Sequence, residues 1–366
     1  MVIDFKALAN SSIHNLQPYQ PGKPIDELQR ELGINQVIKL ASNENPLGPS
    51  KYAIEAAQKT LEQVYLYPDG SGYELKQALA KGFNLSAAQI TLGNGSDNVL
   101  SLIAQTFVKP GQDILISQYA YSTFAIIASA INANAVFAPA KNWAHDLSAI
   151  AKNITAKTQL IFLANPNNPT GTWFSEAELV SLLEAIPSHI LVVSDEAYNE
   201  YIDEPDYPDT LKLQQKYPNL IITHTFSKIY ALAGLRVGYA ISHPDIADMI
   251  NRIRLPFNVS SPALAAASAA FQDQQHCKKS IEMNMRGKAQ LSAAFTRMNL
   301  EYIPSMCNFV TVDVRRDANK IYQALLREGV IVRPLTPYNM PTHLRISIGL
   351  AEENEIFIQA LAKVLS

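Results

Sequence analysis

The chain has 366 residues, 48% of them hydrophobic, with a formal net charge of −3 and a pI near 6.2. Its lysines and arginines are scattered without a basic run, which excludes the usual electrostatic basis for binding nucleic acid. A chain of this length is expected to form one large domain and a smaller one.

The N-terminal residues and the two cysteines indicate the cellular compartment in which the protein is expected. Residues 1–16 carry charges early and contain no long apolar segment, and no later window is apolar enough to cross a bilayer, so we expect no signal peptide and no membrane contact. The two cysteines, Cys277 and Cys307, have no metal-ligand spacing, and neither a bound metal nor a disulfide framework is expected. These features predict a reduced, cytoplasmic protein.

Along the chain, the first fifty residues contain five prolines and are expected to be mostly extended. From residue 87 a short apolar run, a turn and an amphipathic helix recur. The predicted strand and helix pairs are 87–96 with 97–108, 113–118 with 122–133, and 158–168 with 175–186, the last helix beginning at a capping box of Ser175 and Glu178. Apolar runs at 189–198 and 220–228 are further strands. This alternation predicts an α/β fold with a mostly parallel sheet covered by helices on both faces.

The pattern changes near residue 244. Helices are expected at 244–254, at 262–275 and onward to about Met298. Strands at 308–314, 330–335 and 343–350 then alternate with helices at 318–329 and 352–365. We therefore predict an N-terminal segment (1–50) packing with the small domain, a large ligand-binding domain (51–255) and a small α+β domain (256–366).

Polar side chains follow several of the predicted strands, where open α/β sheets bind their ligands. Residues 91–98 (TLGNGSDN) place Ser96 and Asp97 at a helix start, which suits a phosphate. The turn lacks the GxGxxG spacing and a Walker lysine, so neither a dinucleotide nor a nucleoside triphosphate is favoured. Asn168 lies in NPNNPTG, which alone is equally a stiff Asn/Pro turn. Asp195, directly after an apolar strand, needs a cationic partner if it is buried.

Lys228 follows the strand at 220–228 and is expected at the rim of the sheet, partly withdrawn from water. Desolvation lowers the pKa of an ammonium group, and the neutral amine is a nucleophile that can form an imine with a carbonyl cofactor. Arg236, eight residues later, returns to the same place as an anion-binding group. Taken alone, Lys228 is also compatible with an ordinary surface lysine.

Together these groups fit one cofactor, pyridoxal 5′-phosphate. It requires a lysine for the imine, an acid for the protonated ring nitrogen, an Asn and a Tyr for the phenolic oxygen, and a phosphate cradle with an arginine. Asp195, Asn168 and Tyr198 supply the middle three groups. Lys228, once displaced by substrate, is placed to act as a general base at the substrate Cα.

The sequence resembles the fold-type I pyridoxal-phosphate-dependent aminotransferases over nearly its whole length. NPNNPTG at 165–171 and TFSKIYALAGLRVGY at 225–239 are specific to this superfamily. SNENPLGPS at 42–50, with GVIVRP at 329–334 and HLRISIG at 343–349, indicates its histidinol-phosphate branch. Further shared motifs are YQPGKPIDELQRELG, YPDGSGYELK, GNGSDN, DEAYNEY and RLPFNVS.

The resemblance implies a role for each residue at the cofactor. Lys228 would hold it covalently and be the catalytic base, Asp195 would pair with the ring nitrogen, and Asn168 and Tyr198 would bind the ring oxygen. Tyr121 would stack on the ring. The cofactor phosphate would be held by Ser96, Asp97, Thr225, Ser227 and Arg236. The family is a homodimer with sites at the subunit interface, and Tyr67 would reach the partner's cofactor phosphate.

The resemblance also implies the substrate site. Arg345 would bind either the carboxylate of glutamate or the phosphate of histidinol phosphate, because one guanidinium can hold both anions. Arg333, Asn168 and Tyr19, the last from the other subunit, would assist. The implied reaction is transamination between histidinol phosphate and 2-oxoglutarate, giving imidazole acetol phosphate and glutamate, in histidine synthesis.

Two departures from the family pattern keep other activities open. Asn98 stands where the family more often has a glutamate, and SQYAYSTF at 117–124 lacks a proline that many relatives have before the aromatic residue. An aromatic amino-acid aminotransferase shares nearly all of these motifs, and a decarboxylase of the threonine-phosphate type would use the same Lys228 and Asp195. A transcription regulator on this fold is disfavoured because no basic helical extension precedes residue 40.

Overall fold

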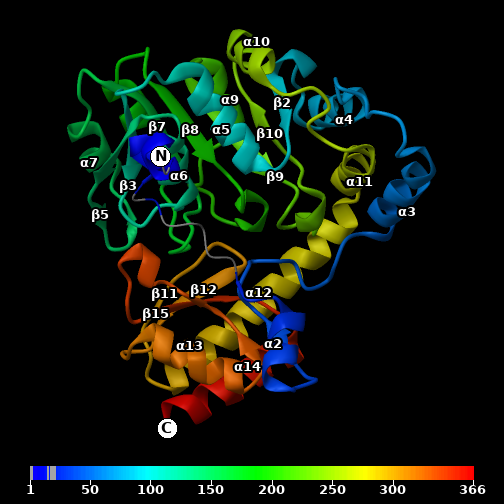
Figure 1. Cartoon of the computed structure of the whole chain (residues 1–366), viewed down its shortest axis with the longest axis vertical. Helices are drawn as coiled ribbons and strands as arrows, with labels where there is room; N and C mark the ends of the chain where they lie inside the picture. Colours follow the sequence, from blue (N-terminus) through cyan, green and yellow to red (C-terminus); the bar gives the residue numbers. More distant parts are fainter. Residues whose placement is uncertain (1–2, 15, 17–21) are drawn as a thin grey trace.

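A computed structural model describes residues 3–14, 16 and 22–366, so Tyr19 lies outside the described residues. Figure 1 shows two parts joined by the long helix α12 (Gln274–Arg297). One part is built on a seven-stranded sheet and the other on a four-stranded sheet. The C-terminus lies in the second part, whereas residues near the N-terminus lie beside α6 (Thr123–Ala130) of the first.

The seven-stranded sheet has the order β2-β10-β9-β8-β7-β3-β4. Its strands are β2 (Ile90–Gly93), β3 (Asp113–Ser117), β4 (Asn134–Ala138), β7 (Thr158–Ala164), β8 (Leu191–Asp195), β9 (Leu220–Thr225) and β10 (Gly238–Ile241). Neighbouring strands are parallel except β10, which runs antiparallel to both β2 and β9. The predicted α/β fold with a mostly parallel sheet is confirmed, and β4 and β10 are strands that the apolar runs did not reveal.

Helices cover both faces of this sheet, which is why five of its strands are buried at every position. On one face α5 (Ser96–Phe107), α6 and α10 (Pro244–Ile253) pack against β3, β7 and β8. On the other, α7 (Leu147–Lys152), α8 (Glu176–Ala185) and α9 (Thr210–Lys216) pack against β7 and β8. The predicted capping box of Ser175 and Glu178 at the start of α8 is present.

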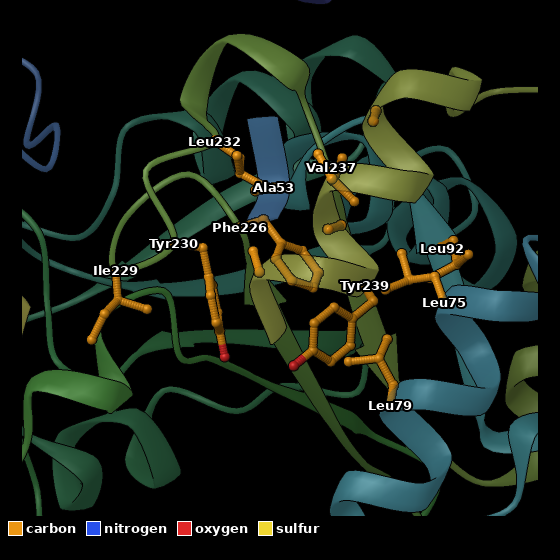
Figure 2. Close-up of a cluster of buried hydrophobic side chains, with 14 of the residues drawn as sticks. Ala53, Leu75, Leu79, Leu92, Phe226, Ile229, Tyr230, Leu232, Val237 and Tyr239 are labelled. Atoms are coloured by element: carbon orange, nitrogen blue, oxygen red, sulfur yellow. The ribbon is translucent and has the colours of Figure 1, made fainter. Parts of the chain in front are cut away.

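A third group of helices packs beside β10. It consists of α3 (Lys51–Thr60), α4 (Tyr73–Phe83) and α11 (Ser261–Gln272). Figure 2 shows its aromatic centre, where Phe226 lies between Tyr230 and Tyr239 with ring centroids 4.8 and 5.7 Å away. Since Phe226, Ile229 and Tyr230 are all buried, the backbone on both sides of Lys228 is anchored in this core.

The four-stranded sheet is antiparallel, with the order β11-β12-β15-β14. Its strands are β11 (Tyr302–Ile303), β12 (Phe309–Asp313), β14 (Arg333–Pro334) and β15 (His343–Ser347), and it packs against α12, α13 (Ala318–Arg327) and α14 (Ala351–Leu365). The α12 helix ends at Arg297, close to the expected Met298, and Asp273 separates it from α11 by capping its first turn.

The N-terminal segment is less extended than expected. It contains the helix α2 (Ile25–Leu32), which ends at Gly33 in a left-handed conformation, as well as α1 (Phe5–Leu8). The strand β1 (Ile38–Lys39) pairs in parallel with β13 (Val330–Ile331), and Leu28 packs beside it. Residues 25–41 of the segment therefore lie against the part built on the four-stranded sheet, whereas Ser12 donates to the Ser129 oxygen of α6 in the other part. The proposed domain boundaries at residues 50 and 255 stay predictions.

The remaining elements are short and lie between those already described. They are β5 (Ala140–Lys141), β6 (Ala144–His145) and the 3₁₀ turns η1 (Ser11–Ile13), η2 (Leu61–Gln63), η3 (Ala87–Gln89), η4 (Asn199–Tyr201), η5 (Ala233–Leu235) and η6 (Thr336–Tyr338). No helix in the described part of the chain is long and apolar enough to cross a membrane. The described residues also contain no group of three or more His, Cys, Asp or Glu side chains that could hold a metal ion.

Candidate active site

A cavity of about 230 Å³ lies beyond the carboxyl ends of β7, β8 and β9. It collects twelve of the expected site residues: Ser96, Asp97, Tyr121, Asn168, Asp195, Tyr198, Thr225, Ser227, Lys228, Arg236, Arg333 and Arg345. These residues come from the strands and loops of both sheets, and the outermost two, Ser96 and Arg345, are 249 positions apart in the chain. The cavity is therefore formed where the two parts of the molecule meet.

Lys228 lies after the end of β9, and its Nζ donates a hydrogen bond to the backbone oxygen of Ser42 at 3.3 Å. Burial and the nearby Arg345 lower its pKa to about 8, against the opposing effect of Asp97 and Glu44. A lysine with this pKa is partly neutral near physiological pH, so its amine is available as a nucleophile and a base.

Asp195 is the last residue of β8 and is only 5% exposed. Its Oδ1 accepts a hydrogen bond from Thr223 Oγ1 at 2.9 Å, yet burial raises its pKa to about 7. A buried carboxyl group in this condition gains from a cation placed beside it. The protonated ring nitrogen of pyridoxal 5′-phosphate is such a cation.

Tyr198 and Asn168 face the cavity from two loops that follow β8 and β7. The Tyr198 hydroxyl accepts a hydrogen bond from Asn43 Nδ2 at 2.9 Å, and Lys228 Nζ lies 5.7 Å from the centre of its ring. Asn168 Oδ1 accepts a hydrogen bond from Arg345 Nη1, which links the two sheets directly. The phenol, the amide and the lysine thus converge on one region of the cavity.

The turn between β2 and α5 forms a small polar cradle. Gly95 has a φ of +80°, and a Cβ there would lie 2.4 Å from Arg236 Nη2. A Cβ on Gly238 would lie 2.3 Å from the Ser96 amide nitrogen, so both glycines are required for this close approach. The first amides of α5 therefore lie open beside a guanidinium, an arrangement that binds phosphate.

Side chains complete this cradle. Arg236 donates to Ser227 Oγ at 3.2 Å and lies 3.3 Å from Asp97 Oδ2. Thr225 Oγ1 donates to Ser227 Oγ at 3.0 Å, and the Tyr121 hydroxyl donates to Asp97 Oδ1 at 3.1 Å. The three hydroxyls of Thr225, Ser227 and Tyr121 and the guanidinium of Arg236 therefore gather at the start of α5.

Arg345 carries the opposite wall of the cavity. It lies on β15, is 6% exposed, donates to the Ala41 oxygen at 2.9 Å and lies over the Phe309 ring at 5.3 Å. Its Nε is buried without a hydrogen-bond partner in the described part of the chain. Arg333 on β14 is its register partner, so two guanidinium groups gather at this wall. Such a wall suits a carboxylate or a phosphate.

The residues described so far fit pyridoxal 5′-phosphate. The cradle offers amides, hydroxyls and a guanidinium for its phosphate, and the buried Asp195 offers a carboxylate for its ring nitrogen. Lys228 offers the amine for its aldehyde. The guanidinium groups of Arg345 and Arg333 also line the cavity, and their charge suits a second anion.

One expected site residue, Tyr67, does not line this cavity. Tyr67 is 81% exposed on the loop before α4, where its ring stacks on Phe257 at 4.6 Å. Its contact with the partner's cofactor phosphate stays a prediction. Tyr19 falls on the undescribed residues.

The cavity also contains residues to which the sequence motifs assign no role: Ser42, Asn43, Glu44, Ala164, Pro166, Ala197, Ala233 and Tyr338. Residues 42–44 belong to SNENPLGPS, so the motif was a signal although its residues were not placed at the site. Tyr338, whose hydroxyl donates to Ser122 Oγ at 3.2 Å, lies in a segment without a motif. Only the folding of η6 towards α6 brings it to the site.

Comparisons with known proteins agree with this geometry. Residues 35–361 match the family model for aminotransferase class I and II. Histidinol-phosphate aminotransferase 1 of Nitrosococcus oceani is 52% identical, covering 99% of this chain and 98% of that protein. Histidinol-phosphate aminotransferase 2 of Pseudomonas fluorescens is 51% identical, covering 99% of both chains. The crystal structure of the Sinorhizobium meliloti histidinol-phosphate aminotransferase in complex with pyridoxal-5′-phosphate has a TM-score of 0.88 at 29% identity, covering 98% of this chain and 97% of that one.

Proposed function

The chain belongs to the class I and II aminotransferases, and on that premise we propose that it transfers an amino group between histidinol phosphate and 2-oxoglutarate in the synthesis of histidine. Imidazole acetol phosphate and glutamate are the other pair of reactants. The observation that carries this function is the guanidinium wall of Arg345 and Arg333 across the cavity from Lys228 and Asp195. It suits the phosphate of one substrate and the carboxylate of the other.

Pyridoxal 5′-phosphate, when bound, supplies an electron-withdrawing ring that stabilises negative charge at the substrate Cα. Asp195 would keep the proton on the ring nitrogen, since the ion pair would relieve the cost of its own burial. Tyr198 and Asn168 would hold the ring through its oxygen, and Tyr121, which also lines the cavity, would pack on the ring.

Lys228 performs the proton transfers. Its neutral Nζ would take the proton from the substrate Cα and hold it as an ammonium, which a pKa near 8 permits at neutral pH. The ammonium would then give this proton to the carbon of the former cofactor aldehyde, and Nζ would be neutral again. The amides of Ser96 and Asp97, with Thr225, Ser227 and Arg236, hold the cofactor phosphate still during this step. Arg345, assisted by Arg333, binds the substrate anion and so directs Cα towards the lysine.

We further propose that the protein works as a homodimer with Tyr67 completing the partner's site. The loop around η2 exposes Leu61, Val64, Tyr65, Leu66 and Tyr67 by 54 to 81%, and Leu255 is 74% exposed. An apolar surface of this kind is typical of a protein interface. Tyr67, which does not line the cavity of its own chain, is then available to the other subunit's phosphate.

Hybrid dimers test this arrangement. A Tyr67→Ala subunit keeps its own Lys228, and a Lys228→Ala subunit keeps its Tyr67, so a mixed dimer contains one intact site. We expect the mixture to recover activity that neither variant has alone. Absence of recovery in a verified mixed dimer would contradict the shared site.

A cytoplasmic location is proposed as well. Cys277 and Cys307 are both buried and unbonded, which fits a reducing compartment. Fractionation of cells, with activity measured in each fraction, checks this proposal.

The substrate is tested by a single half-reaction. Histidinol phosphate, added to the cofactor-loaded enzyme without a keto acid, should abolish the visible band of the bound cofactor and release one imidazole acetol phosphate per site. Faster conversion by phenylalanine would indicate an aromatic amino-acid aminotransferase instead. Carbon dioxide release from threonine phosphate would indicate a decarboxylase.

A further inference from the structure

A chain of polar side chains runs from the end of β2, beside the phosphate cradle, to the loop that carries Tyr67. Asn98 Oδ1, in the first turn of α5, accepts from the Asn94 amide at 3.1 Å and from Asn258 Nδ2 at 3.2 Å. Asn258 Nδ2 also donates to the Leu92 oxygen at 3.2 Å. Arg254 donates to Asn258 Oδ1 at 2.7 Å and to the Gly70 oxygen at 2.8 Å.

The orientation of both amide groups in this chain is fixed by their neighbours. Asn258 faces a guanidinium donor on one side and two oxygen acceptors on the other, so its oxygen must point to Arg254. Asn98 faces two N–H donors, so its oxygen must point to them. Reversing either amide would set donor against donor or acceptor against acceptor. The network therefore permits one arrangement.

Asn98 is also held tightly against the end of β2. A Cβ on Gly93 would lie 3.2 Å from Asn98 Oδ1 and 2.4 Å from the neighbouring Val99 side chain. The amide of Asn98 is thus wedged between the strand end and Asn258, and it fixes the Asn94 amide at the start of the turn. The next two residues of that turn, Gly95 and Ser96, form the cradle beside Arg236.

We propose that Asn258 is a positioning residue for the cofactor: through Asn98 it fixes the phosphate-binding turn, and through Arg254 it ties that turn to the loop that carries Tyr67. This inference rests on the proposed function, because the turn matters only if it holds the cofactor phosphate. It deepens that function by naming residues that touch neither cofactor nor substrate. It also assigns a role to Asn98, a position at which the sequence departs from its family.

The Asn258→Asp variant disturbs the contact of residue 258 with Asn98 while keeping its contact with Arg254. The aspartate keeps an oxygen for Arg254 and adds an ion pair to it, so the fold is retained. Its second oxygen, however, faces Leu92 O and Asn98 Oδ1 and repels both. If Asn98 reverses its amide to donate to the new carboxylate, it abandons the Asn94 amide. In either case the turn loses a hydrogen bond, and we expect the dissociation constant for pyridoxal 5′-phosphate to rise about tenfold.

The measurement is a titration of the cofactor-free full-length protein with pyridoxal 5′-phosphate, followed by the visible band. The turnover number at saturating cofactor should stay within about threefold of wild type, because the reacting groups are untouched. Asn251→Ala is the matched control, since Asn251 accepts only from Arg254 Nε, at 3.0 Å, within this network. Its cofactor affinity should stay within about twofold.

A double-mutant cycle completes the test. Asn98→Ala and Asn258→Ala should each weaken cofactor binding, and the double variant should be little worse than either alone. Additive effects, or an Asn258→Asp variant with wild-type affinity, would overturn the inference. Failure of the wild-type protein to develop the visible band would instead refute the proposed function, so the two failures are distinguishable.

Discussion

The two walls of the cavity are built in different ways. The wall that would hold the cofactor is made of consecutive strand ends of one sheet, and its side chains contact one another: Thr223 with Asp195, Ser227 with Arg236, Tyr121 with Asp97. The facing wall is assembled from β14, β15 and residues 42–44, and its main guanidinium, Arg345, retains a buried Nε without a partner in the described chain. The side chains of the first wall, which we call the prebuilt wall, are thus held by one another. The facing wall retains a guanidinium nitrogen that can still donate to an anion.

This difference teaches how one site can serve two substrates. Groups that act in every half-reaction are fixed by the same core that forms the sheet. Ile229 and Tyr230, which follow Lys228 in the chain, pack in that core (Figure 2). Groups that must accept either a carboxylate or a phosphate lie on a separate sheet, where their spacing is set by the contact between the two parts. Substitutions in the wall that would hold the cofactor should therefore lower the rate of the reaction, whereas substitutions in the facing wall should weaken substrate binding.

The largest effect is expected for the prebuilt wall. Lys228→Ala removes the base and the amine, so the half-reaction with histidinol phosphate should slow by about 10⁴-fold or more. Rapid-mixing measurement of the visible band checks this. Lys288→Ala is the matched control, because that lysine is also partly buried but donates to Ser305 O outside the cavity. The activity of the control should be nearly that of wild type. A half-reaction rate of the Lys228 variant within about a hundredfold of wild type would contradict the role of Lys228 as the base.

Asp195→Asn should slow the reaction by about 10³-fold, since the neutral amide does not hold the ring-nitrogen proton. It should also stabilise the cofactor-free protein. The folded pKa of Asp195, about 7, lies above its ordinary value, so the folded state binds more protons and loses stability as the pH rises from about 4 to 7. Removing the carboxylate should raise the unfolding free energy at pH 8 by about 1–3 kcal/mol, measured by urea denaturation.

Glu196→Gln is the control for this prediction. Glu196 is equally buried, with a pKa raised to about 8, but its carboxylate accepts from Ser194 and faces His224 behind the sheet. We expect the same gain in stability with activity within about tenfold of wild type. Equal losses of activity in both variants would show that burial, and not contact with the cofactor, governs the effect.

Arg345→Lys probes the facing wall. An ammonium cannot reproduce the fork that donates to Asn168 and Ala41 while binding an anion, so KM for both substrates should rise about 100-fold. The visible band of the bound cofactor should not change. Arg315→Lys, an exposed residue paired with Glu301, provides the unaffected control. A loss of cofactor binding in the Arg345 variant would show that the walls are not independent.

The smallest effect is a pH dependence. Because the pKa of Lys228 is about 8, the neutral fraction of its amine rises about tenfold between pH 7 and pH 9. The rate at which cofactor-free protein captures pyridoxal 5′-phosphate should rise by the same factor. Stopped-flow absorbance follows this, and a flat profile would contradict a lowered pKa at this lysine.

The same contrast explains what the sequence could predict. Strand ends of a parallel sheet meet at one edge, so the order of motifs was enough to bring Ser96, Asn168, Asp195 and Lys228 together. The role of Arg345 could be predicted only from the resemblance to the family, because the alternating pattern of a strand does not show which of its arginines binds a ligand. Tyr338 was missed because its place depends on how η6 folds over α6. The helix α2 was missed because the prolines around it were taken as evidence of extended chain.

The same cavity bears on how long the protein survives in a cell. The cavity contains a buried carboxyl group, that of Asp195, whose pKa is raised by burial, and the guanidinium nitrogen Nε of Arg345, which lacks an acceptor among the described residues; both lie at the junction of the two parts. A ligand that satisfies these groups stabilises the folded state by mass action. We therefore expect protein loaded with pyridoxal 5′-phosphate to be degraded more slowly than cofactor-free protein. The supply of the vitamin from which the cofactor is made would then set the amount of enzyme as well as its activity.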